Sequence, residues 1–103
     1  MATAIDYMAS NLDCTINISD IATVTNRSPS HLARMFRSEI GMPPHRYLII
    51  LRINKAQRLL AKSSMPIAEI AIECGFSHQE HLTRLFRRHL GTTPAAYRRS
   101  KQN

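Results

Sequence analysis

Residues 81–91 read HLTRLFRRHLG, and fifty positions earlier residues 31–41 read HLARMFRSEIG. Continuing this alignment to Tyr97 pairs seventeen positions, of which eight are identical. The identical pairs are His31/His81, Leu32/Leu82, Arg34/Arg84, Phe36/Phe86, Arg37/Arg87, Gly41/Gly91, Pro44/Pro94 and Tyr47/Tyr97. Chance does not produce this level of identity over so short a segment, so the chain contains an internal repeat.

The repeat extends upstream when the offset is changed from 50 to 49 residues. The matching pairs are then Ile18/Ile67, Ile21/Ile70, Ala22/Ala71 and Ser28/Ser77. The second copy therefore carries one additional residue at the start of its later helix. Each copy reads as a short helix, a turn and a longer helix, which is the layout of a helix-turn-helix motif. The turns are TNRS (25–28) and CGFS (74–77), and Gly75 supplies the permissive backbone that such a turn tends to require.

Apolar residues recur at three- and four-residue spacing along most of the sequence, and strand-like alternation is nowhere sustained. We expect seven helices, at residues 3–12, 18–26, 28–41, 43–63, 66–75, 77–91 and 93–100. Serine and threonine residues mark the expected N-caps, which are Ser19, Ser28, Ser77 and Thr93. Pro29 and Pro94 stand at first helical positions. The expected fold class is all-α, with two helix-turn-helix subdomains joined by a long central helix.

The length of 103 residues is typical of one domain. We expect a single domain over 1–103, with helix-turn-helix subdomains at 3–41 and 66–100 and a linker helix at 43–62. About nineteen residues at 1.5 Å each span roughly 28 Å, close to the ~34 Å of one DNA turn. A single chain of this design could place two helices in successive major grooves.

Both later helices of the repeat sort into an apolar face and a polar face. The side chains expected in the core are Leu32, Met35, Phe36 and Ile40 in the first copy and Leu82, Leu85, Phe86 and Leu90 in the second. In the first helix, 3–12, the expected core stripe is Ile5, Met8 with Ala9, and Leu12. The shared outward arginines, Arg34/Arg84 and Arg37/Arg87, are not required by any core. Their presence in both copies favours a DNA-binding role over a merely solvated helix face.

Positive charge is concentrated away from the N-terminus. The chain has 14 Lys and Arg residues against 7 Asp and Glu, a formal net charge of +7. Residues 1–26 contain no basic residue, whereas 84–101 contain six basic residues and no acidic one. Eleven of the fourteen basic residues are arginines, which suit bidentate contacts with phosphate or guanine. This distribution is typical of a nucleic-acid surface, although a membrane surface or an acidic protein would also match it.

The stretch IAEIAIECGFSHQEHLTRLFRRHLGTTPAAYRR (67–99) resembles the DNA-binding domain of the AraC/XylS family of bacterial transcription regulators. Its pattern of Ile-Ala, Gly-Phe, Arg-Arg, Gly, Thr-Pro and Tyr-Arg is specific, and the resemblance extends over residues 3–99. The resemblance implies two helix-turn-helix subdomains that insert recognition helices into adjacent major grooves. It also implies sequence-specific DNA binding that regulates transcription initiation. RNA polymerase is then a candidate partner.

Carried over by position, the resemblance implies base contacts from Ser30, Ala33, Arg34, Gln79, Glu80, His81, Thr83 and Arg84. The expected phosphate contacts are Ser28, Arg37, Ser77, Arg87 and Arg88, with helix N-termini at the two serines. Ala33 can offer only a methyl contact to thymine. Glu80 could accept from a cytosine amino group or could cap its own helix.

Other functions are weakly supported by the sequence. His78 and His81 lie three residues apart, but no Cys or carboxylate nearby completes a tetrahedral metal set. We expect no enzyme activity, no metal, no cofactor and no membrane partner. Cys14 and Cys74 are read as reduced thiols of a cytoplasmic protein, with a bridge between them as the less favoured alternative. The alternative function is a basic helical module that binds an acidic protein or RNA.

The family also usually carries an N-terminal sensing or dimerising domain. We expect the present domain to be monomeric on DNA, because one chain supplies both recognition helices. A full-length protein would dimerise through the missing N-terminal domain. The chain is read either as a domain cut from such a protein or as a short, single-domain member.

Overall fold

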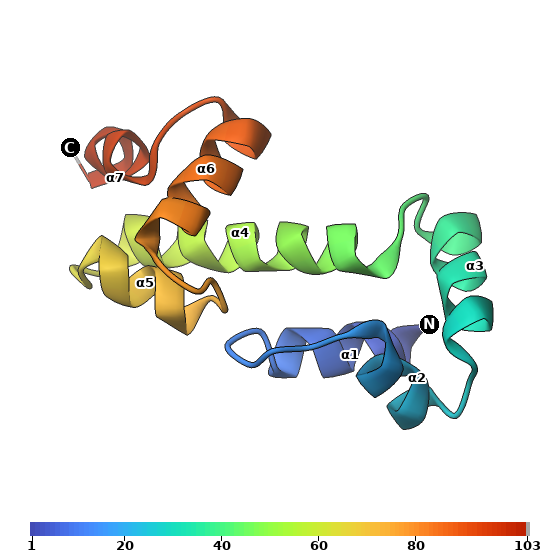
Figure 1. Cartoon of the computed structure of the whole chain (residues 1–103). Helices are drawn as coiled ribbons and strands as arrows, with labels where there is room; N and C mark the ends of the chain where they lie inside the picture. The colour runs from blue at the N-terminus through green and yellow to red at the C-terminus, as the bar shows by residue number, and fades with distance from the viewer. Residues whose placement is uncertain (103) are drawn as a thin grey trace. The chain divides into compact units, whose positions relative to one another are not determined.

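The computed structural model describes residues 1–102, which form seven helices and no strand (Figure 1). The helices are α1 (Ala2–Ser10), α2 (Ile18–Thr25), α3 (Pro29–Glu39), α4 (Pro44–Lys62), α5 (Ile67–Glu73), α6 (Gln79–Leu90) and α7 (Pro94–Gln102). The all-α prediction is confirmed, and each predicted helix has a counterpart in the described residues. None of these helices has the length and apolar character needed to span a membrane.

The chain divides into two compact units, Met1–Leu51 and a second unit that begins at Arg52. The division falls within α4, so that this helix supplies Leu48 to the first core and Ile53, Ala56 and Leu60 to the second set of buried side chains. Each unit contains one helix-turn-helix pair, α2–α3 or α5–α6.

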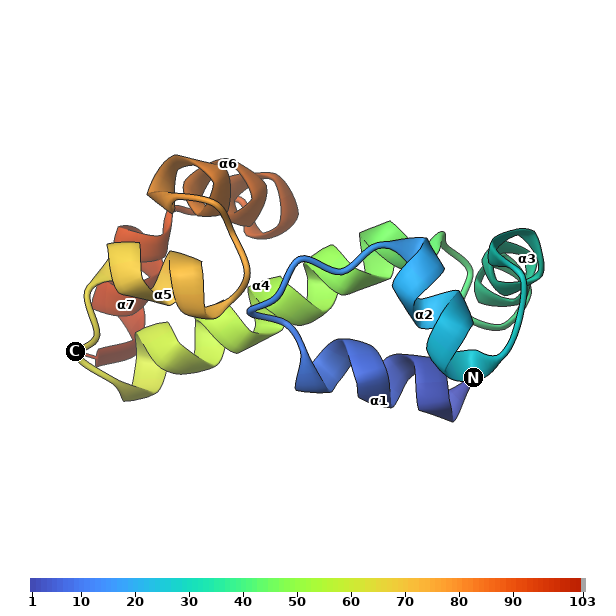
Figure 2. The ribbon, with the colours of Figure 1, turned by 60° about the horizontal axis from the view of Figure 1, so that its bottom comes forward.

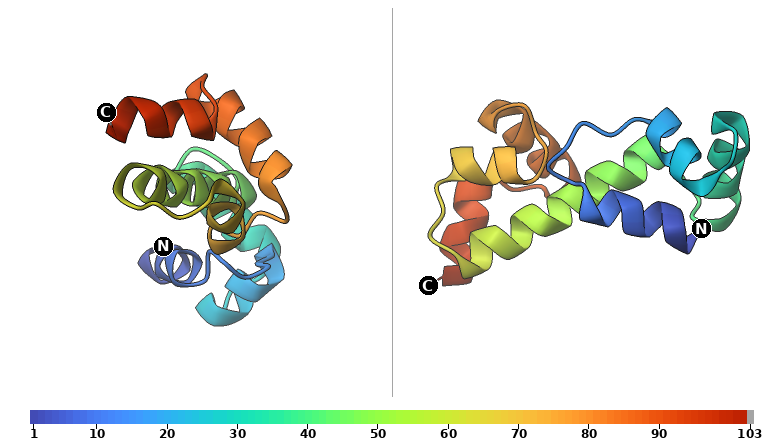
Figure 3. Two further views of the ribbon diagram at one scale, coloured as in Figure 1. Left: turned by 90° about the vertical axis from the view of Figure 1, so that its left-hand side faces the viewer. Right: turned by 90° about the horizontal axis from the view of Figure 1, so that it is seen from below.

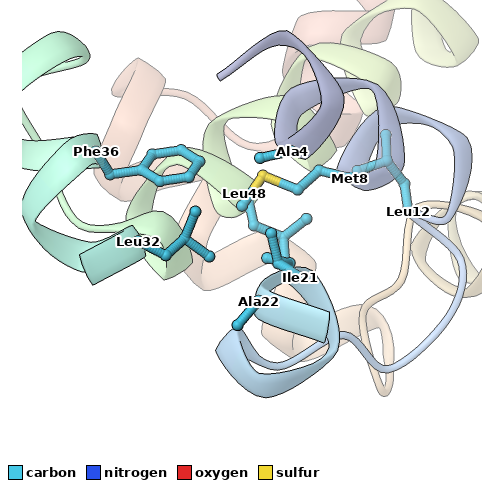
Figure 4. Close-up of a cluster of buried hydrophobic side chains, with 8 residues drawn as sticks. All are labelled: Ala4, Met8, Leu12, Ile21, Ala22, Leu32, Phe36 and Leu48. Carbon is cyan, nitrogen blue, oxygen red and sulfur yellow. The ribbon is translucent and has the colours of Figure 1, made fainter. Parts of the chain in front are cut away.

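The core of the first unit is built from four helices and the turn after α1. Within the unit, α1 packs against α2 and α2 against α3 (Figure 2). The buried cluster consists of Ala4, Met8, Leu12, Ile21, Ala22, Leu32, Phe36 and Leu48 (Figure 4). Because α2 and α3 bury one apolar face each in this cluster, the opposite face of α3 is left to solvent.

The second unit buries the equivalent side chains. Here α5 packs against α6 and α6 against α7 (Figure 3). Its buried residues are Ile53, Ala56, Leu60, Ile70, Ala71, Cys74, Phe76, Leu82, Leu85, Phe86 and Pro94. Burial raises the pKa of the Cys74 thiol to about 11. Both Cys74 and the exposed Cys14 are thiols, as the sequence predicted.

The internal repeat reproduces an aromatic contact in each unit. Phe36 and Tyr47 have ring centroids 6.0 Å apart, and Phe86 and Tyr97, fifty residues later, have centroids 5.4 Å apart. Both phenylalanines are fully buried, whereas both tyrosines are partly buried. The rings therefore serve packing, which explains why these positions are identical between the two copies.

Helix α7 supplies hydrogen bonds to the C-terminal end of α4. Arg98 donates from Nε to the Leu60 carbonyl at 3.2 Å and from Nη2 to the Ser63 carbonyl at 3.3 Å. Gln102 donates from Nε2 to the same two carbonyls, at 2.8 and 2.9 Å. Two side chains thus share the carbonyl groups that the end of a helix leaves without intrahelical donors.

Two of the predicted N-caps are wrong. Helix α2 is capped by Asn17 rather than Ser19, since Asn17 and Asp20 form a reciprocal capping box. Helix α6 begins at Gln79 with His78 as the N-cap residue, so that Ser77 lies outside the helix. The additional residue of the second copy accounts for this shift. Ser28 and Thr93 accept from the amides of His31 and Ala96, as expected of N-caps.

Some expected core residues also differ. Ala9 and Leu90 are exposed, and 39% of the surface of Leu90 is accessible. In α1 the buried residues are Met8, as expected, and Ala4, which lies in the core where Ala9 was expected. Ile5, Met35 and Ile40 are only partly buried. Leu90 is the last residue of α6, and at this end of the helix the apolar face is no longer covered by neighbouring helices.

Candidate nucleic-acid interface

The two helix-turn-helix pairs turn by the same backbone geometry. In the first, Asn26 has φ 56° and the Arg27 amide donates to the Ala22 carbonyl at 2.9 Å. In the second, Gly75 has φ 91° and the Phe76 amide donates to the Ala71 carbonyl at 2.9 Å. Sequence reasoning identified Gly75 and missed Asn26. The signal was present, because asparagine is one of the few residues that tolerate the left-handed region.

Helix α3 presents its predicted contact residues on one side. Ser30, Arg34 and Arg37 are exposed, and Ala33 is partly buried. Ala33 and Arg37 line a hollow of about 470 Å³ whose floor includes Met8, Ile21 and Leu48. Ser28 is exposed at the N-cap, but its hydroxyl oxygen already accepts from the His31 amide at 3.1 Å.

Helix α6 gathers most of the predicted contacts of the second unit. A surface depression of about 600 Å³ is lined by Gln79, Glu80, Thr83, Arg84 and Arg87. All of these are exposed except Thr83, which is partly buried. Arg88 and Ser77 are exposed outside the depression. The depression therefore combines two guanidinium groups, a carboxylate, an amide and a hydroxyl on one helix face, a set able to donate to and accept from base edges.

The repeated histidine is held by the turn of its own unit. In the first unit, Nη1 of Arg27 lies 3.2 Å from Nε2 of His31. In the second, the His81 ring meets Phe76 edge-on, with centroids 5.3 Å apart. Arg27 and Phe76 are equivalent residues of the two turns. Sequence reasoning did not single out Arg27, although it is an exposed basic residue of the first turn.

His81 is partly buried, whereas Gln79 and Glu80 immediately before it are exposed. Burial lowers its pKa below the usual value, and the positive charges of Arg84, His78 and Arg52 lower it further. The imidazole is consequently neutral near pH 7. A neutral ring can donate from one nitrogen and accept at the other, and the His81 ring also packs perpendicular to the Phe76 ring.

Two helix-turn-helix units, each with an exposed basic recognition helix, define the chain as a tandem helix-turn-helix protein. The family model described as a helix-turn-helix domain matches residues 21–100. A crystal structure of an AraC-type regulator from Chromobacterium violaceum has a TM-score of 0.93 and 32% identity, and covers 97% of this chain and 89% of that one. The chain therefore belongs to the AraC-type helix-turn-helix family.

Other relatives are regulators of bacterial transcription by name. The chain is 34% identical over 87 residues to the HTH-type transcriptional regulator GbdR of Pseudomonas aeruginosa, covering 84% of this chain and 24% of GbdR. It is 30% identical over 92 residues to the probable transcriptional regulator LumQ of Photobacterium leiognathi, covering 89% of this chain and 37% of LumQ. The chain thus spans about a quarter to a third of the length of these curated relatives.

One solved relative was determined with nucleic acid. The DNA-binding domain of AdpA, in complex with a target DNA, has a TM-score of 0.91 and 35% identity to this chain. The match covers 96% of this chain and 89% of the AdpA domain.

Proposed function

We propose that this chain binds duplex DNA sequence-specifically through α3 and α6, in adjacent major grooves, and thereby regulates the initiation of bacterial transcription. The observation that carries the proposal is the pairing of exposed arginines at equivalent positions of two recognition helices, Arg34 with Arg84 and Arg37 with Arg87. The structural similarity to the AdpA domain solved on its target DNA supports the same conclusion.

The proposed contacts follow the exposed faces of the two helices. Base edges are read by Ser30, Ala33 and Arg34 in the first unit and by Gln79, Glu80, His81, Thr83 and Arg84 in the second. Phosphates are bound by Ser28, Arg37, Ser77, Arg87 and Arg88. Since phosphate contacts give affinity and base contacts give specificity, the two groups should respond differently to mutation.

The domain organisation is part of the proposal. Residues 1–103 act as a single DNA-binding domain, in which 3–41 and 66–100 are the helix-turn-helix subdomains and 43–62 is the linker helix. This domain binds DNA as a monomer in the cytoplasm. RNA polymerase is the proposed protein partner, and a longer protein that contained this domain would dimerise through a further, N-terminal domain.

The function is tested by selecting the DNA sequences that the protein binds from a pool of random duplexes. Variants of two arginines on α6, with different expected effects, serve as controls for each other. Arg84→Ala should cost about 1–3 kcal/mol on the selected site and relax one base position. Arg87→Ala should weaken selected and random DNA alike and reduce the slope of log affinity against log salt by about one. Equal losses from both variants on both kinds of DNA would contradict these roles. If the protein enriched no motif, the alternative of a basic module for an acidic protein or RNA would gain support.

A further inference from the structure

Glu80 is an exposed carboxylate on the face of α6 that carries Arg84 and Arg87. It is the second residue of the helix and lines the same surface depression as the two arginines. A recognition helix enters the major groove with its N-terminal residues toward the bases. The carboxylate is thus placed where base edges would be read. A phosphate contact is not an alternative role for it, because the negatively charged phosphates would repel a carboxylate.

A capping role does not account for Glu80. The N-cap residue of α6 is His78, and no side-chain hydrogen bond caps this end of the helix. The His78 carbonyl accepts from the amides of His81 and Leu82. Within residues 1–102 the side chain of Glu80 makes no hydrogen bond or ion pair, so both carboxylate oxygens remain available as acceptors.

Ionised carboxylates accept hydrogen bonds but cannot donate them. In the major groove, cytosine offers its N4 amino group as a donor, whereas guanine offers N7 and O6 as acceptors and thymine offers O4. Adenine also offers an amino donor at N6, but its N7 acceptor lies beside that donor and would face the carboxylate, which favours cytosine over adenine. A carboxylate facing guanine or thymine would therefore be desolvated without a partner, which costs affinity. Glu80 is expected to select by rejecting the wrong bases as well as by binding the right one.

The neighbouring arginine fixes where this base lies. Glu80 and Arg84 are four residues apart on one helix, so they share a face and are separated by about 6 Å along the helix axis. Successive base pairs are about 3.4 Å apart, so this separation corresponds to about two base steps. Arginine pairs bidentately with guanine O6 and N7.

We propose, resting on the DNA binding proposed above, that Glu80 selects a cytosine within two base pairs of a guanine read by Arg84. The equivalent positions of the first unit are Ser30 and Arg34, which keep the arginine but lack the carboxylate. The half-site read by α6 is therefore the more restrictive of the two, because at this pair of equivalent positions α6 combines an obligate acceptor with an obligate donor and α3 does not.

The test replaces Glu80 by its own counterpart in the repeat, Glu80→Ser, and separately by the isosteric Glu80→Gln. Glu73→Gln is the matched control, because Glu73 is also exposed and acidic but lies on α5, outside the depression. Selected-sequence profiles from random duplex pools are compared for wild type and the three variants. Thermal unfolding is recorded for each protein.

Wild type should enrich a cytosine near a guanine, and Glu80→Ser should lose about tenfold or more of the preference at the cytosine position alone. Glu80→Gln should also lose preference there, because its amide can donate as well as accept. Glu73→Gln should leave the profile unchanged. The inference is overturned if Glu80→Ser keeps every base preference of the wild type while only its melting temperature falls, since Glu80 would then serve only the dipole of α6. If wild type enriches no motif, the proposed function fails first and this inference fails with it.

Discussion

The shared carbonyls at the end of α4 make a quantitative prediction about the second unit. Arg98 and Gln102 each donate to the carbonyls of Leu60 and Ser63, so that either side chain alone still satisfies both groups. A net hydrogen bond contributes about 0.5–1.5 kcal/mol. Both bonds to the Leu60 carbonyl and the bond from Arg98 to the Ser63 carbonyl are partly buried, whereas the bond from Gln102 to the Ser63 carbonyl is exposed. Arg98→Ala and Gln102→Ala should therefore each cost about 0.5–1 kcal/mol.

The double variant should cost about 2–3 kcal/mol, because both carbonyls then lose their last side-chain donor. The excess over the sum of the single variants is an expected coupling free energy of about 1 kcal/mol. Amide hydrogen exchange at Leu85 and Phe86, which are buried in the second unit, measures this loss locally.

Arg99→Ala is the matched control, because Arg99 is an exposed arginine on the same helix. It should change exchange at these amides very little. Strictly additive losses from Arg98→Ala and Gln102→Ala would refute the reasoning, since they would mean that the two side chains do not share their acceptors. An equal loss from Arg99→Ala would point to the charge or helix propensity of α7 as the cause.

Three further predictions concern single positions. Gly91 has φ 73° and a Cβ there would meet nothing within 4 Å, so Gly91→Ala should cost about 1–2 kcal/mol from backbone strain alone, and Gly91→Asn less, as measured by urea unfolding. The folded state lowers the pKa of His81, so the unfolded chain binds more protons below about pH 6.5 and stability should fall as the pH falls through that range. His81→Gln should flatten this part of the stability profile, and an unchanged profile would contradict the assignment to His81. Cys74 is fully buried with a pKa of about 11, so a thiol reagent should modify it only when urea unfolds the protein. The exposed Cys14 should react in the folded protein, at a rate slowed by the neighbouring Asp13 carboxylate, which raises the pKa of the Cys14 thiol. Equal rates for the two thiols in the folded protein, read by mass spectrometry, would argue against the burial of Cys74.

The fold was largely predictable because the repeat combined apolar periodicity with Pro and Gly at helix ends. Ser28, Thr93 and the buried pair Phe36 and Phe86 were all found this way. Errors arose where several polar residues competed for one role. At the start of α2, Asn17 is the N-cap rather than Ser19, because Asn17 and Asp20, three residues apart, form a reciprocal capping box. The spacing was readable in the sequence, and the choice of Ser19 overlooked it.

The candidate interface was predictable to a smaller extent. Helical spacing predicted which arginines are exposed, namely Arg34, Arg37, Arg84 and Arg87. Once the apolar face of a helix is known to be buried, the residues on the opposite face must point to solvent. The contact between Phe76 and His81 did not follow, because it joins a turn to a helix across the additional residue of the second copy. A periodicity argument treats each helix alone, and it cannot assign side-chain contacts made between elements.

The common turn geometry has a consequence for redesign. Both turns pass through a left-handed residue, Asn26 or Gly75, and the amide of the next residue, Arg27 or Phe76, donates to an alanine carbonyl. The α2–α3 and α5–α6 pairs therefore share one backbone frame and differ mainly in their solvent-facing side chains. Outward residues of one recognition helix could be grafted onto the other without altering either apolar core. The preferred DNA sequence of such a chain could therefore be changed by substituting a few outward residues of one recognition helix, and then of the other, so that one half-site is altered at a time.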